Sequence, residues 1–162
     1  MTDAVVTPAN LFSTNMRMID IYLVSCVGEK HDRAMPAKDL YASQWFRKAR
    51  EYVERRGGIW YILSAKHGLI SADQVIEPYE QTLNRMPIAG RRHWAQRVRE
   101  QLDVQLWADL NRDPWQSGRC VVLVGNRYRE FLMDYLTGRF TVEIPMDGLT
   151  IGKQLQWLKN HR

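Results

Sequence analysis

Three short apolar segments of this chain, residues 19–24, 59–63 and 120–124, each run directly into polar, cationic or titratable side chains. The side chains that follow them are those of Ser25, Cys26, Lys30, Ser64, Lys66, His67, Asn126 and Arg127. α/β proteins carry their chemistry where buried parallel strands end. We therefore expect a functional site where these three segments end, although each end taken alone fits a simple strand-to-helix turn.

Titratable residues near these segment ends are candidates for acid–base chemistry. A carboxylate beside a sugar stabilises developing oxocarbenium charge or activates water, and Glu80 is our first choice for that role and Asp39 our second. At the position of His67 a histidine can exchange protons near neutral pH, and at the position of Lys66 a cation can bind a phosphate or stabilise a leaving base. If Lys66 and His67 face solvent, they have no such role.

Other residues of the same segments suit the recognition of a nucleic acid base. Tyr41 and Tyr79 can stack on a base, and Asn126 can contact a base edge through its paired donor and acceptor. Packing tyrosines and a helix-capping Asn126 explain the same residues equally well. As a set we assign nucleic-acid or base binding to Ser25, Cys26, Lys30, Tyr41, Ser64, Lys66, Tyr79, Asn126 and Arg127.

The two cysteines, Cys26 and Cys120, are expected to be reduced thiols, because the chain carries no export signal. Cys26 as a nucleophile would need a positioned base such as His31 or His67, and a buried structural cysteine is the simpler interpretation. No spacing of Cys and His resembles a zinc site. We therefore expect neither a metal nor another cofactor.

Composition predicts one globular domain and favours an anionic partner. The chain has 162 residues, of which 45% are hydrophobic, and a net charge of +5 that favours an anionic partner such as DNA. An ordinary basic surface explains this charge equally well. Without a membrane-spanning run or secretory signal, we expect a cytoplasmic protein with no membrane contact. The basic residues expected to meet phosphates are Arg47, Lys48, Arg50, Arg55, Arg56, Arg85, Arg91, Arg92, Arg97 and Arg99.

The pattern along the chain predicts a loosely ordered leader over residues 1–17 and a single α/β domain over residues 18–162. We expect a three-layer domain, in which a small, mostly parallel central sheet is flanked by helices. A long loop is expected over residues 66–87, as a lid or pocket wall. Helices are expected over residues 40–56, 88–110, 128–136 and 149–159, with an edge strand over 140–144.

Several motifs together resemble a known family. They are Cys26, Lys30, Pro36-Ala37, Asp39-Leu40-Tyr41, residues 62–69, Pro78-Tyr79, Gly125 with Tyr128, Gly148-Leu149 and Ile151-Gly152. Over residues 20–158 the chain resembles the DUF6884 family of bacteria and phages. Residues 63–79 are also similar to the peroxide-stress YaaA family, whose members bind DNA. The strand-end cysteine and lysine resemble domains of archaeosine-type tRNA base modification, and the layout resembles uracil-DNA-glycosylase-like α/β domains.

These resemblances imply a protein that acts on nucleic acid bases. Our leading hypothesis is a DNA glycosylase-like hydrolase that cleaves the N-glycosidic bond of a modified or damaged base, in DNA repair or antiphage defence. Two glycosylase signatures, Gly-Gln-Asp-Pro-Tyr and His-Pro-Ser, do not occur in the chain. The alternatives are a non-catalytic DNA-binding protein and an enzyme acting on free nucleotides or nucleosides.

Overall fold

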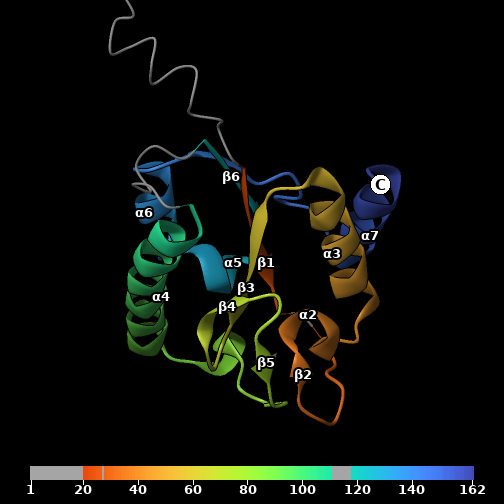
Figure 1. The fold of residues 1–162 in the computed structure, drawn as a ribbon, viewed down its shortest axis with the longest axis horizontal. Coiled ribbons are helices and arrows are strands. Elements are labelled where there is room, and N and C mark those ends of the chain that lie inside the picture. Colours follow the sequence, from red (N-terminus) through yellow and green to blue (C-terminus); the bar gives the residue numbers. More distant parts are fainter. Residues whose placement is uncertain (1–19, 27, 111–117) are drawn as a thin grey trace, which may run out of the picture.

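A five-stranded sheet forms the centre of the computed structural model, which describes residues 20–26, 28–110 and 118–162 (Figure 1). The strands are β4 (Gly68–Ser71), β3 (Ile59–Ser64), β1 (Ile21–Ser25), β6 (Arg119–Leu123) and β7 (Thr141–Glu143), in that order across the sheet. All pairs are parallel except β3 with β4. The expected α/β class with a mostly parallel sheet is confirmed. The expected leader over residues 1–17 lies outside the described residues.

Helices cover both faces of this sheet, because alternate strand residues point to opposite sides. Ile21 and Leu23 pack against α4 (Ile88–Leu110), together with α5 (Asn126–Arg129) and α6 (Met133–Thr137). Tyr22 and Val24 pack against α3 (Gln44–Arg56) and α7 (Ile151–Asn160). Figure 1 shows α4 and α6 on one side of the strands and α3 and α7 on the other. The result is the expected three-layer arrangement.

The chain changes direction across the sheet at the middle strand, β1. After β1 it passes through α2 (Ala37–Leu40) and α3 to β3 on one side, and α4 then carries it back to β6 on the other side. The connection that leaves the carboxyl end of β1 therefore runs to β3 on one side, and the connection that leaves the carboxyl end of β6, through α5 and α6, runs to β7 on the other side. In open α/β sheets such a crossover point leaves a crevice in which ligands bind.

The expected loop over residues 66–87 contains three short elements instead. β4 pairs antiparallel with β3, β5 (Val75–Ile76) pairs with β2 (Met35–Pro36), and Leu83–Arg85 form a 3-10 helix, η1. Gly68, at φ +72°, allows the chain to reverse directly after β3. These elements are too short for an apolar period, which is why the sequence pattern missed them.

The helix expectations were right for the long helix and less accurate elsewhere. α4 spans residues 88–110 as expected, with Trp94, Val98, Leu102 and Leu106 buried. The expected helix over 40–56 is divided, because Ser43 caps α3 by accepting a hydrogen bond from the Phe46 amide. The expected helix over 128–136 is likewise divided into α5 and α6, and α7 begins at residue 151, not 149. No helix in the described ranges has the length and apolar character needed to cross a membrane.

Candidate functional site

Two pockets open at the carboxyl ends of β1 and β6, at the crossover point. We call them the Lys30 pocket, of about 430 Å³, and the Trp45 pocket, of about 360 Å³. Both are lined by Ser25, Gly125 and Asn126, so they adjoin at these residues. These volumes lie in the range of small-molecule sites.

The Lys30 pocket brings together six of the residues assigned from the sequence, namely Ser25, Cys26, Lys30, Glu80, Asn126 and Arg127. Its remaining lining comes from Gly28, Gln81, Thr82, Asn84, Gly125 and Tyr128. The pocket thus combines two cationic side chains, one carboxylate, several amides and a thiol. A set of this kind can bind a phosphate, hydrogen-bond to a polar ring and exchange a proton.

Backbone contacts fix the position of Lys30 at the rim of its pocket. Residues 30 and 41 form an isolated antiparallel bridge, and the Ala42 amide donates to the Glu29 carbonyl at 2.7 Å. The Lys30 ammonium lies 4.5 Å from the ring centroid of Tyr79 and 5.6 Å from that of Tyr41. No carboxylate in the described part of the chain is within ion-pairing distance of Lys30 or Arg127. Both cations therefore remain available to an anion.

Gly28 allows the turn after β1 to pack against the start of α3. It has a φ of +82°, and an added Cβ atom would lie 2.7 Å from Cβ of Ser43. A side chain here would be strained by the backbone conformation and would clash with the residue that caps α3. Gly28 itself lines the Lys30 pocket, together with Asn126, Arg127 and Tyr128 of α5.

A buried chain of hydrogen-bonded hydroxyl groups includes the two tyrosines that lie beside Lys30. The Ser64 hydroxyl donates to the Tyr79 hydroxyl at 2.6 Å, and the Tyr79 and Tyr41 hydroxyls share a hydrogen bond of 2.7 Å. Burial, followed by the negative charge of a Cys26 thiolate, raises the pKa of both tyrosines above their usual range. Both phenols are therefore neutral at physiological pH. Tyr41, Tyr79 and Ser64, assigned to base binding from the sequence, are buried behind the pocket lining.

Cys26 is a half-buried thiol in the wall of the Lys30 pocket. Its backbone amide donates to the Leu63 carbonyl at 3.1 Å, which extends the contact between β1 and β3. Its sulfur lies 4.0 Å from the hydroxyl of Tyr128. Burial, with a further contribution from a Cys26 thiolate, raises the pKa of Tyr128 to about 12. Tyr128 is therefore a neutral partner at this position and no base for the thiol.

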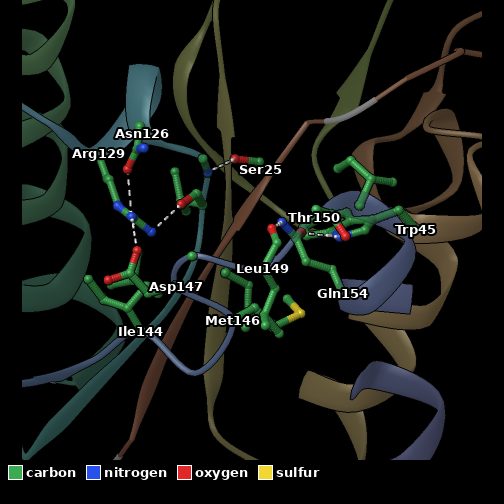
Figure 2. Close-up of a pocket in the computed structure, with 16 residues that line it drawn as sticks. Ser25, Trp45, Asn126, Arg129, Ile144, Met146, Asp147, Leu149, Thr150 and Gln154 are labelled. Carbon is green, nitrogen blue, oxygen red and sulfur yellow. Dashed lines mark hydrogen bonds and ion pairs between the residues drawn. The ribbon is translucent and has the colours of Figure 1, made fainter. Parts of the chain in front are cut away.

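The Trp45 pocket lies between two interlocked groups of side chains (Figure 2). On one side, the indole N–H of Trp45 donates to Oε1 of Gln154 at 2.9 Å, and Nε2 of Gln154 donates to the Leu149 carbonyl at 2.9 Å. On the other side, Arg129 donates to Asn126 at 2.5 Å and to Asp147 at 2.7 Å. Arg129 thereby holds the loop before α7 against α5.

Besides Tyr41, Tyr79 and Ser64, three further assigned residues line neither of these two pockets. The exposed carboxylate of Asp39 pairs with Arg50 at 2.7 Å. The side chain of Lys66 is exposed, while its carbonyl accepts a hydrogen bond from Arg97. His67 packs edge-on against Tyr79, and burial, followed by the charges of Lys66 and Arg97, lowers its pKa. Of the three expected acid–base residues, only Glu80 lines one of these two pockets.

Sequence reasoning missed the residues that form the Trp45 pocket, chiefly Trp45, Arg129, Asp147 and Gln154. Arg129 follows Asn126 by one helical turn, so extending the search one turn beyond the third apolar segment would have included it. Asp147-Gly148 followed by the capping residue Thr150 marks a turn that leads into a helix. Nothing local to Trp45 distinguishes it from a core residue, since its indole is 6% exposed.

An open, mostly parallel sheet with helices on both faces and pockets at its crossover point defines a doubly wound α/β protein. The chain belongs to DUF6884, described as a family of unknown function, whose model matches residues 21–160. The comparisons with curated proteins and with solved structures found no match.

Proposed function

We propose that this protein is a nucleic-acid base-processing enzyme, a DNA glycosylase-like hydrolase that cleaves the N-glycosidic bond of a modified or damaged base. The observation that carries the proposal is the lining of the Lys30 pocket at the crossover point. There Lys30 and Arg127, which have no ion-pair partner among the described residues, lie with the carboxylate of Glu80. The sequence resemblance of residues 63–79 to the YaaA family points in the same direction.

Each group has a distinct role in this proposal. Lys30 and Arg127 bind the phosphates that flank the target nucleotide, and Asn126 hydrogen-bonds to the base. Glu80 accepts a proton from a water molecule while the oxygen of that water bonds to C1′ of the sugar. The negative charge of Glu80 stabilises the oxocarbenium-like transition state. The base leaves with the electron pair of the broken bond and takes up a proton. The products are an abasic sugar and a free base.

The first experiment is to incubate the purified protein with genomic DNA that carries natural or phage-type modified bases. Released small molecules are identified by mass spectrometry, and abasic sites are detected by strand cleavage. We expect Glu80→Gln to lower the rate of base release by about 10²-fold or more, since positioned acid–base groups contribute 10²–10⁴-fold. Glu77→Gln is the matched control, because Glu77 is exposed and lines neither pocket.

The outcomes separate the rival functions. A freed base with matching abasic sites supports the hydrolase and names its substrate. DNA that is bound in a salt-dependent manner but stays intact contradicts the hydrolase and favours a non-catalytic DNA-binding protein. Equal turnover of free nucleosides and of DNA favours an enzyme of free nucleosides instead. Loss of activity in Asp39→Asn but not in Glu80→Gln would overturn the assignment of the carboxylate.

A further inference from the structure

The two adjoining pockets differ in the charge that they offer a ligand. The Lys30 pocket contains Lys30 and Arg127, neither of which has an ion-pair partner among the described residues, and the single carboxylate of Glu80. In the Trp45 pocket the charged residues Arg129 and Asp147 neutralise one another at 2.7 Å. An anionic group is therefore favoured in the first pocket and a neutral group in the second.

The walls of the Trp45 pocket suit a flat ring with a polar edge. Much of the lining is apolar and includes Trp45, Ile144, Met146 and Leu149 (Figure 2). Small-ligand sites commonly have an apolar lining of this kind with a few placed polar groups.

Two polar groups remain available at the Arg129 end of this pocket. Arg129 occupies Oδ1 of Asn126 and Oδ1 of Asp147, which leaves the amide nitrogen of Asn126 as a donor and Oδ2 of Asp147 as an acceptor. A nucleobase edge that presents an acceptor beside a donor complements this pair.

We propose that the two pockets bind one nucleotide unit between them, with its base in the Trp45 pocket and its phosphate in the Lys30 pocket. The inference rests on the proposed function, in that it takes the ligand to be a nucleotide of DNA. The sugar then lies at Ser25, Gly125 and Asn126, the residues common to both pockets. This placement makes the Trp45 pocket the specificity pocket of the enzyme.

Gly125 keeps the junction between the pockets open. A Cβ atom built at Gly125 meets no atom within 4 Å, and its φ of −67° is accessible to any residue. A larger side chain here is therefore compatible with the fold and occupies the space assigned to the sugar. Gly152, in the first turn of α7, has equally open surroundings but lines neither pocket. The two glycines make a matched pair for substitution.

The test is a titration of the isotopically labelled protein, followed by two-dimensional NMR, with deoxynucleoside 5′-monophosphates, the matching deoxynucleosides and inorganic phosphate. The indole N–H signal of Trp45, assigned with Trp45→Phe, reports on the Trp45 pocket, and the backbone amides of Lys30 and Arg127 report on the Lys30 pocket. We expect a deoxynucleoside to shift the indole signal of Trp45 and phosphate to shift the amide signals of Lys30 and Arg127. A monophosphate should shift the signals of both pockets. The monophosphate should bind at least about tenfold more tightly than either part, because contacts to a charged group add to those of the base.

Three variants sharpen the result. Lys30→Gln should weaken the binding of the monophosphate by about tenfold and leave the binding of the deoxynucleoside unchanged, since only the phosphate loses a contact. Gly125→Leu should weaken the binding of both ligands, and Gly152→Leu that of neither. The inference is overturned if the monophosphate shifts the signals of one pocket only, if Lys30→Gln weakens the deoxynucleoside equally, or if none of the four monophosphates binds at millimolar concentration.

The experiments distinguish a failure of the nucleotide-binding inference from a failure of the proposed hydrolase activity. The two-pocket pattern without release of any base from DNA would leave the inference standing and contradict the proposed hydrolase. Base release that is lost in Glu80→Gln but unaffected by Gly125→Leu would support the hydrolase and contradict the placement of the nucleotide.

Discussion

The backbone amide of Gly125 donates a hydrogen bond of 3.3 Å to the hydroxyl of Ser25, although 100 residues separate the two. Ser25 ends β1 and Gly125 follows β6, so the bond exists only because the crossover through α4 places these strands side by side. The same contact joins the Lys30 and Trp45 pockets. The candidate site is therefore a product of the topology of the sheet.

Tyr79→Phe should destabilise the fold by about 1–3 kcal/mol, the cost of leaving buried hydroxyls without a partner. Its hydroxyl lies between those of Ser64 at 2.6 Å and Tyr41 at 2.7 Å, and all three residues are buried. Urea unfolding of Tyr79→Phe, Tyr41→Phe and the double variant measures the coupling. We expect the double variant to cost less than the sum of the two single variants, because both break one network. Strict additivity would show that the chain of hydroxyls does not act as a unit.

Alkaline pH should destabilise the protein through Cys120. Burial raises the pKa of this thiol from 9.0 to about 12, so above pH 9 the unfolded chain loses a proton that the folded chain keeps. The contribution of Cys120 to stability is therefore fully present below pH 9 and falls as the pH rises toward 12, by roughly 1.4 kcal/mol per pH unit. Cys120→Val removes this contribution, so the wild type should lose stability more steeply than the variant in urea unfolding at pH 9–11. Equal slopes would refute the role of Cys120.

The central strands and the longest helix could be predicted from the sequence because their surroundings leave a clear signal. Residues 21–25 and 120–123 are buried, and strands buried on both faces are continuous apolar runs. The spacing of Trp94, Val98 and Leu102 fixes one face of a helix. Polar residues at the strand ends then indicated the Lys30 pocket, since parallel strands end at the same edge of a sheet.

The choice among carboxylates and the second pocket could not be predicted, because both depend on contacts between distant segments. Asp39 and Glu80 are equally polar in sequence, yet Arg50 pairs with Asp39 while Glu80 lines the Lys30 pocket. The Trp45 pocket requires Arg129 to reach Asp147 across the loop after β7, and Trp45 to meet Gln154 from a helix 109 residues away in the sequence. The spacing of apolar residues within a single segment carries no information about either contact.

His67 should be neutral at physiological pH and should destabilise the fold when it is protonated. Burial lowers its pKa below 6.5, and the charges of Lys66 and Arg97 lower it further. Because the unfolded histidine binds a proton more readily, stability is present above pH 6.5 and is lost as pH falls through the folded pKa. An NMR titration of the imidazole measures the value directly. Lys66→Gln should raise the pKa only in part, since burial is the larger cause, and a full return to 6.5 would contradict that order.

Asp147→Asn should loosen the wall of the Trp45 pocket while hardly changing overall stability. The side chain of Asp147 is 62% exposed, so its ion pair with Arg129 contributes less than about 1 kcal/mol. Arg129 also keeps its hydrogen bonds to the Val124 carbonyl and to Asn126. The substitution does, however, free the loop before α7 from α5. We therefore expect faster amide hydrogen exchange over residues 146–150 at nearly unchanged unfolding free energy.

The matched control for Asp147→Asn is Asp73→Asn. Asp73 pairs with Lys38 at 2.6 Å, its side chain is 83% exposed, and neither residue lines the Trp45 pocket. This variant should cost equally little stability and leave exchange over residues 146–150 as in the wild type. If Asp147→Asn also leaves that exchange unchanged, then the apolar contacts of Met146 and Leu149 with the α3 side of the core hold the loop, and the ion pair is dispensable to the pocket. Faster exchange in Asp147→Asn alone would establish Arg129 as the residue that positions this wall.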